Sequence, residues 1–148
     1  MSDSDILELN RLASRYAAAV DRRDVDAFLA VFTPDARMRS YHPKSEEPFA
    51  DARGHEQLAS VPETMDKMFG ITVHQMTNHL VEVDGDAASG SVLCTARHLS
   101  VDPDDDTAVV VIIRYVDEYE RRDGRWCIHD RQIRFLWSER HQVAEPGF

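Results

Sequence analysis

Hydrophobic positions in the first thirty residues recur at the spacing of amphipathic helices. Between residues 4 and 20 the apolar side chains step by three and four positions, which places them on one face of a helix. These positions are Ile6, Leu9, Ala13, Tyr16 and Val20. Ser4 or Asp5 is a suitable N-cap for this helix. The stretch "RDVDAFLAVF" predicts a second helix, which Asp24 caps and "TPDA" ends.

The pattern then changes from helical spacing to alternation. Residues 36–42 predict a short strand, "PKSEEPFADARG" a loop, and "HEQLASVPETMDKMF" a helix that is interrupted or restarts at Pro62. Four longer strands are predicted at residues 71–83, 87–101, 107–120 and 124–137. Their connectors "DGD", "DPDDDT" and "RRDG" are typical of turns, so the strands should be antiparallel neighbours. The sequence predicts an α+β fold in which the helices cover this meander.

Several polar residues interrupt the apolar faces of these strands. His74 and His79 lie five positions apart on one strand, so their side chains point to opposite faces unless a bulge intervenes. His98 falls on an apolar face of the next strand, and Arg131 on one of the last strand. A single strand histidine is commonly a structural residue. An arginine among apolar residues needs an anion or an acidic partner, and a structural salt bridge would also satisfy it.

Asp21 lies at the edge of the apolar stripe of the first helix, where it either caps the turn, faces water or pairs with another residue. An aspartate that accepts a hydrogen bond from one imidazole nitrogen leaves the other nitrogen as a general base. The sequence contains no Gly-x-Ser-x-Gly, phosphate-binding loop, dinucleotide fingerprint or His-Glu-x-x-His. A metal site of His74, His79 and His98 is disfavoured, because His74 and His79 are expected to point to opposite faces of their strand. We therefore expect neither a metal nor another cofactor.

Composition narrows the class of protein further. The 148 residues suit one domain, and a hydrophobic content of 43% supplies a core. The net charge of −10 argues against nucleic-acid binding. Cys94 and Cys127 fit neither metal nor disulfide spacing, so we expect two core thiols in a reducing compartment. No apolar run could span a bilayer and "MSDSDILELN" is not a secretory signal, so we expect a cytoplasmic protein without a membrane partner.

Two stretches, "YAAAVDRRDVDAFLAVFTPDA" and "VDEYERRDGRW", resemble SnoaL-like proteins of the nuclear transport factor 2-like superfamily. Scytalone dehydratase, ketosteroid isomerase, lindane dehydrochlorinase and limonene epoxide hydrolase share that fold. The resemblance spans roughly residues 5–138 of a single domain at 1–148, with a tail at 139–148. It implies a cone-shaped barrel, in which a curved antiparallel sheet wraps around N-terminal helices and encloses a deep apolar pocket.

The resemblance also implies a site. In the dehydratase and dehydrochlorinase branch an aspartate late in the first helix orients a histidine on the strand after the third helix, and these positions are Asp21 and His74. His74 should then face the pocket, with His79 on the outer face or at a strand irregularity. The scytalone dehydratase tyrosine before its aspartate is Val20 here, so that exact activity is not expected. The implied or available substrate-binding residues are Tyr16, His98, Arg131 and Tyr115.

The implied function is a cofactor-free lyase or isomerase of the dehydratase type, acting on a small apolar cyclic or carbonyl compound. A polyketide-type cyclase could use the same base. A non-catalytic small subunit of a ring-hydroxylating dioxygenase, or a small-molecule-binding protein, could use the same fold. By analogy the chain should form a homo-oligomer, a dimer or trimer, with Gln75, Thr77 and His79 near a subunit contact.

Overall fold

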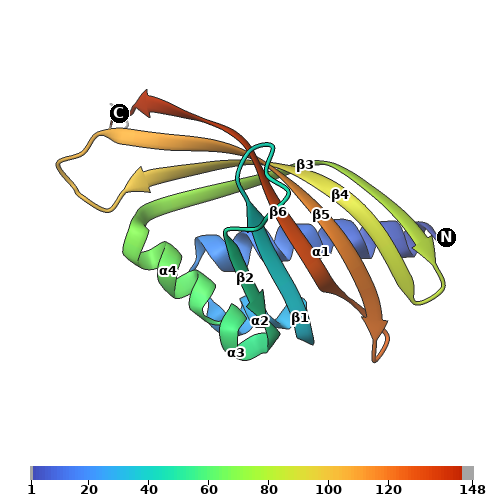
Figure 1. The fold of residues 1–148 in the computed structure, drawn as a ribbon. Coiled ribbons are helices and arrows are strands. Elements are labelled where there is room, and N and C mark those ends of the chain that lie inside the picture. Colours follow the sequence, from blue (N-terminus) through green and yellow to red (C-terminus); the bar gives the residue numbers. More distant parts are fainter. Residues whose placement is uncertain (1, 145–148) are drawn as a thin grey trace.

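A curled six-stranded sheet and the helices packed against it make up residues 2–144, the part of the chain that the computed structural model describes (Figure 1). In chain order the elements are α1 (Asp3–Asp21), α2 (Val25–Ala30), β1 (Phe32–Tyr41), β2 (Ala50–Arg53), α3 (Gly54–Leu58), α4 (Ser60–Met68), β3 (Phe69–Asp84), β4 (Ala87–Ser100), β5 (Thr107–Arg122) and β6 (Arg125–Gln142). The predicted α+β class is confirmed.

The two N-terminal helices form where the apolar spacing predicts them. α1 begins slightly earlier than expected, because Ser2 is its N-cap and forms a capping box with Asp5. Asp24 caps α2 as predicted, and its carboxylate accepts a hydrogen bond of 2.9 Å from the backbone of Ala27. The predicted third helix is two short ones, separated at Ala59. Pro62 lies in the first turn of α4, where a proline is tolerated.

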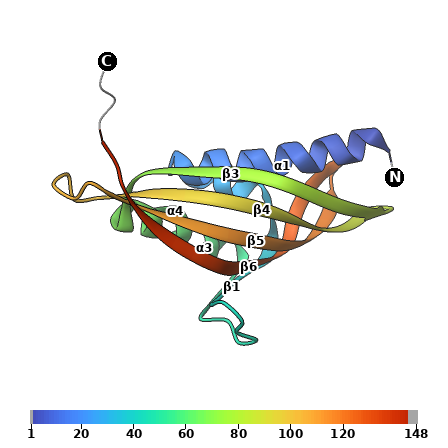
Figure 2. The same cartoon turned by 90° about the horizontal axis from the view of Figure 1, so that it is seen from above.

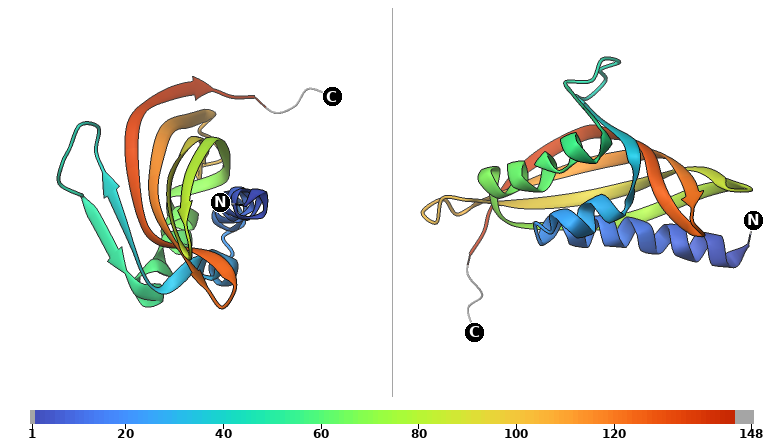
Figure 3. Two further views of the ribbon diagram at one scale, coloured as in Figure 1. Left: turned by 90° about the vertical axis from the view of Figure 1, so that its right-hand side faces the viewer. Right: turned by 90° about the horizontal axis from the view of Figure 1, so that it is seen from below.

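The strand order is β2-β1-β6-β5-β4-β3, with β2 and β3 at the two edges. The sheet is therefore curled but not closed, and seen end-on it forms an arc with α1 beside β3 and the β1–β2 hairpin on the other side (Figure 3). The four-stranded meander is the predicted one. Two details were not predicted: residues 50–53 pair as a strand within the expected loop, and β1 pairs with β6 in parallel.

A bulge in β3 changes which side chains face α1. The pairing of β3 with β4 shifts between Thr77 and Leu80, and Asn78 has a positive φ of 50°. Before the bulge the even-numbered residues face inward, so that Thr72 is buried while Ile71 is exposed. After it the odd-numbered residues face inward. His74 and His79 consequently lie on the same side of the sheet, although five residues separate them.

The helices and the sheet enclose one apolar core. α1 runs along β3 with its buried face against the sheet (Figure 2). β6 continues to Gln142, so the predicted tail is partly strand, and its last residues, 145–148, lie outside the described residues. None of the helices in residues 2–144 has both the length and the apolar character that crossing a bilayer requires.

Candidate active site

Asp21 and His74 lie together at the junction of α1 and β3, as the family resemblance implies. His74 Nδ1 is 2.7 Å from Oδ1 of Asp21, and the backbone N–H of His74 donates to Oδ2 at 2.9 Å. The hydroxyl of Thr72 donates to Oδ1 at 2.9 Å. Asp21 is the last residue of α1, so the end of this helix delivers a carboxylate to the strand that carries the imidazole.

These hydrogen bonds determine the protonation of the pair. Burial alone would raise the pKa of Asp21, but the hydrogen bonds from the ring and backbone of His74 and from Thr72 outweigh burial and lower it. The carboxylate is thus an acceptor only, so neutral His74 carries its proton on Nδ1. Its Nε2 makes no hydrogen bond within residues 2–144 and holds the free lone pair. This is the arrangement of an oriented general base.

His98 lies beside this pair, where the resemblance places it. Its ring makes an edge contact with His74 at a centroid distance of 5.4 Å and stacks on Phe69 at 4.4 Å. His98 is 6% exposed, and neither ring nitrogen has a hydrogen-bond partner within the described residues. Burial, reinforced by the charge of His74, lowers the pKa of His98 to about 4. A neutral imidazole with unused polar atoms therefore adjoins the candidate base.

Arg131 is fully buried and has an acidic partner that the sequence reading did not identify. Its Nε and one terminal nitrogen donate to the two carboxylate oxygens of Asp117 at 2.8 and 2.7 Å. The guanidinium lies between the rings of Tyr16 and Tyr115, with centroids at 4.1 and 4.3 Å. Its remaining terminal nitrogen has no partner within residues 2–144. Tyr16, Tyr115 and Arg131, three of the predicted substrate-binding residues, thus lie in one cluster. The same cluster contains the buried ion pair of Arg131 with Asp117.

Because of the bulge, His79 lies in a second set of hydrogen-bonded side chains, with Asn10, Tyr119 and Asp117. Its ring nitrogens lie 2.8 Å from the amide oxygen of Asn10 and 3.0 Å from the hydroxyl of Tyr119. Tyr119 donates in turn to Asp117 at 2.8 Å. The expectation that His79 lies at a strand irregularity is confirmed. Because its side chain contacts Asn10 of α1, the alternative position of His79 on the outer face of the sheet is wrong.

The largest signal missed in the sequence is the pairing of Asp117 with Arg131. The two residues are direct cross-strand partners in β5 and β6. Asp117 falls on the inward face of β5, between Tyr115 and Tyr119. In "YVDEY" the alternation places an aspartate on the apolar face of its strand, and the next strand carries an arginine on an apolar face. This pattern could have indicated the ion pair.

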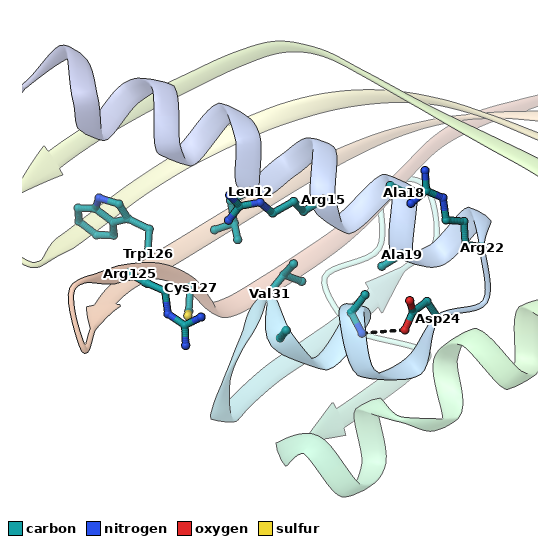
Figure 4. Close-up of a pocket in the computed structure, with 12 residues that line it drawn as sticks. Leu12, Arg15, Ala18, Ala19, Arg22, Asp24, Val31, Arg125, Trp126 and Cys127 are labelled. Atoms are coloured by element: carbon teal, nitrogen blue, oxygen red, sulfur yellow. Dashed lines mark hydrogen bonds between the residues drawn. The ribbon is translucent and has the colours of Figure 1, made fainter.

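Three clefts lie away from the Asp21–His74 pair. One, of about 290 Å³, opens between α1, α2 and the start of β6, and its lining includes Arg15, Arg22, Arg125 and the half-buried thiol of Cys127 (Figure 4). A second, of about 260 Å³, adjoins His79 at the bulge. A third, of about 570 Å³, crosses β3, β4 and β5. Asp21 and His74 line none of these three clefts. The expectation of two core thiols thus holds for buried Cys94, while Cys127 borders the first cleft.

Comparisons with known proteins agree on the family. The model of the SnoaL-like domain matches residues 3–132, nearly the whole chain, so this protein belongs to the SnoaL-like domain family. A curated relative, an uncharacterized protein of Mycobacterium tuberculosis strain H37Rv, is 31% identical over 99 residues, which cover 62% of this chain. The match spans only 58% of that relative's length.

Solved structures of similar fold include two that are named as enzymes. A type 2 hexachlorocyclohexane dehydrochlorinase is 21% identical, with a TM-score of 0.82 over 98% of this chain and 96% of its own. A candidate scytalone dehydratase from Novosphingobium aromaticivorans DSM 12444 is 20% identical, with a TM-score of 0.80 over 95% and 90%. At these identities the likeness shows the shared fold alone, which is the one that the resemblance predicted.

Proposed function

We propose that this protein is a cofactor-free lyase or isomerase that removes a carbon-bound proton from a small, largely apolar cyclic or carbonyl compound. The observation that carries the proposal is the contact between Asp21 and His74. The carboxylate accepts a hydrogen bond from Nδ1, and Nε2 makes no hydrogen bond within residues 2–144. A partly buried imidazole held in one tautomer by an ionised carboxylate has the geometry of a general base. The dehydrochlorinase and dehydratase names among proteins of the same fold support an elimination.

In the proposed reaction His74 Nε2 accepts the proton. The electron pair of the broken C–H bond forms a carbon–carbon double bond. A hydroxide or halide leaves the neighbouring carbon with the electron pair of the bond that joined them. Isomerisation differs in that the imidazolium returns its proton to another carbon. The ionised Asp21 stabilises the imidazolium as it forms, so no buried charge is left without a partner.

The neighbouring groups suit binding and charge stabilisation. His98 stays neutral near pH 7 and can donate a hydrogen bond to a leaving group or a carbonyl oxygen. The unpartnered terminal nitrogen of Arg131 is a second available hydrogen-bond donor on an inward-facing side chain. Half-buried apolar residues on the same face of the sheet supply the apolar contacts. These are Met76, Val111 and Phe135.

The test is turnover of a panel of halogenated or hydroxylated cyclic compounds and enolisable ketones, with products identified by mass spectrometry. On any compound that is converted, His74→Ala should abolish turnover and Asp21→Asn should reduce kcat by roughly 10²–10⁴-fold. Deuterium at the abstracted position should slow the wild-type reaction. His141→Ala removes an exposed histidine at the end of β6 and is the matched control, with unchanged turnover expected.

Wild-type rates in His74→Ala would contradict the proposal, because a group other than His74 would then remove the proton. Product structure separates the alternative of a polyketide-type cyclase, because a cyclase forms a carbon–carbon bond whereas an elimination releases hydroxide or halide.

A further inference from the structure

Arg23 has an unfavourable backbone conformation for an arginine. It directly follows Arg22, the C-cap of α1, and has a φ of 56°. This left-handed region is uncommon for residues with a Cβ, whereas glycine reaches it without steric cost. Strained conformations of this kind persist where the surrounding contacts hold them, and they cluster near functional sites. The side chain of Arg23 must therefore make contacts that offset the strain.

The guanidinium of Arg23 joins the end of α1 to the start of β3. One terminal nitrogen lies 2.8 Å from the carbonyl oxygen of Val20 and 2.8 Å from the hydroxyl oxygen of Thr72. The other lies 2.9 Å from the carbonyl of Gly70 and 3.4 Å from that of Phe69. A planar fork of donors thus holds two segments that are nearly fifty residues apart in the chain.

These contacts fix the direction of the neighbouring hydrogen bonds. A guanidinium only donates, so the Thr72 oxygen accepts from Arg23 and its own proton is left to donate to Asp21. Oδ1 of Asp21 therefore accepts the hydrogen bond from the Thr72 hydroxyl. Because a carboxylate oxygen only accepts, its contact with His74 requires the imidazole proton to be on Nδ1. The series of donors runs from Arg23 through Thr72 and Asp21 to His74. It leaves the lone pair of the imidazole on Nε2.

We propose that Arg23 and Thr72 are positioning residues, which hold Asp21 ionised and His74 in the Nδ1–H tautomer. Neither residue needs to touch the substrate. The inference rests on the proposed function, because the free Nε2 has a use only if His74 is a base. Its first test, however, measures the imidazole itself and needs no substrate.

That test uses protein labelled with ¹⁵N-histidine, with His74 assigned by its loss in His74→Ala. In the wild type the Nδ1–H of His74 should give a signal protected from solvent exchange. In Arg23→Gly the protection should fall or the signal should disappear, because Thr72 and the start of β3 lose their anchor. Glycine suits the positive φ, so the variant should remain folded. Arg22→Ala removes the same charge one residue away and is expected to keep the signal.

The second test separates positioning from general loss of structure. With a converted substrate, Arg23→Gly should lower kcat by roughly tenfold, within the 10² that small displacements of catalytic groups can cost, and leave KM unchanged. Thr72→Val should do the same, and Thr72→Ser should restore most of the rate. If Arg23 acts through Thr72, the double variant Arg23→Gly/Thr72→Val should be no slower than Thr72→Val alone.

Two results would overturn the inference: an unchanged Nδ1–H signal in Arg23→Gly, or fully additive rate losses in the double variant. Either can occur while His74→Ala still abolishes turnover, in which case the proposed function stands without this positioning. Conversely, a lost Nδ1–H signal in Arg23→Gly supports the positioning even if no tested compound is converted.

Discussion

Asp21 and Asp117 are both carboxylates inside the same fold, yet their surroundings differ. Asp117 has a fully buried side chain and accepts two hydrogen bonds from Arg131 and one from Tyr119. The side chain of Asp21 is 23% exposed and accepts from Thr72 and His74. Arg131 carries a permanent charge, whereas the imidazole of His74 has a second ring nitrogen that can accept a proton.

The partner of each carboxylate decides what the pair can do. The buried Asp117–Arg131 pair joins a carboxylate to a guanidinium that always carries its charge, so it favours one packing of β5 against β6. The pairing also raises the pKa of Arg131, since burial opposes the charge but Asp117 outweighs it. An aspartate–histidine pair leaves one nitrogen unbonded and can accept a proton from outside. The first is suited to structure and the second to proton transfer.

The largest expected effect is on the buried ion pair. Arg131→Leu leaves the Asp117 carboxylate buried without its partner, and this should lower the free energy of unfolding by about 3–5 kcal/mol. Urea denaturation followed by circular dichroism measures the change. The two tyrosine rings also lose the cation that separates them, which adds to the cost.

The matched control replaces both charges with apolar groups, as Asp117→Leu/Arg131→Leu. Because no buried charge remains unpaired, the double variant should recover much of the lost stability. A double variant less stable than Arg131→Leu would contradict this expectation, and it would show that Asp117 stabilises the fold through contacts other than Arg131, such as the hydrogen bond from Tyr119.

The next effect is the pH dependence that His98 imposes. Its pKa of about 4 lies below the roughly 6.5 of an unfolded histidine, so between these values the unfolded chain binds a proton that the folded chain does not. Stability should therefore be complete above pH 6.5 and fall on acidification, by up to about 3 kcal/mol near pH 4. Urea denaturation at pH 7 and at pH 4.5 measures the loss.

His98→Leu should remove most of this pH dependence, because leucine does not titrate. His79, whose pKa burial also lowers, should account for part of the remainder. The exposed His141 gives a control, since His141→Ala should show the wild-type dependence. Equal losses in His98→Leu and the wild type would place the titrating group elsewhere.

Comparison of the two carboxylates also shows which contacts sequence reasoning can find. Asp21 and His74 were expected through the family resemblance, because their order along the chain and their elements match that branch. Asp117 was not expected, although alternation places it on the apolar face of β5. Which residues face each other across two strands depends on the register. The register of β5 and β6 includes shifts that no sequence pattern indicates.

The differences in fold have similar causes. The parallel contact of β1 with β6 joins segments that are far apart in the chain, and no local pattern near Phe32 or Ile128 indicates it. β2 is a four-residue edge strand whose sequence contains charged residues, so its alternation is weak. The cap of α2 and the meander were predictable because they depend on residues that lie close together in the chain.

A smaller effect is expected at the link between His79 and Asp117. Tyr119→Phe keeps the ring but removes the hydroxyl that donates to Asp117 and contacts His79. Two partners in the core then lose a hydrogen bond, at a cost of about 1–2 kcal/mol in the free energy of unfolding. Tyr41→Phe is the control, because the Tyr41 hydroxyl makes no hydrogen bond within residues 2–144, and it should be near neutral. Equal effects of the two changes would show that the link contributes nothing.

The smallest effect is expected for a glycine at the bulge that turns His79 inward. Asn78 has a φ of 50°, which asparagine tolerates and glycine adopts freely, so Asn78→Gly should change stability by less than about 0.5 kcal/mol. Asn78→Val places a β-branched residue there and should cost about 1–3 kcal/mol. Urea denaturation gives both values. If valine were tolerated as well as glycine, the strand would have another way to bring His79 to Tyr119, and the bulge would not be what places both histidines on one side of the sheet.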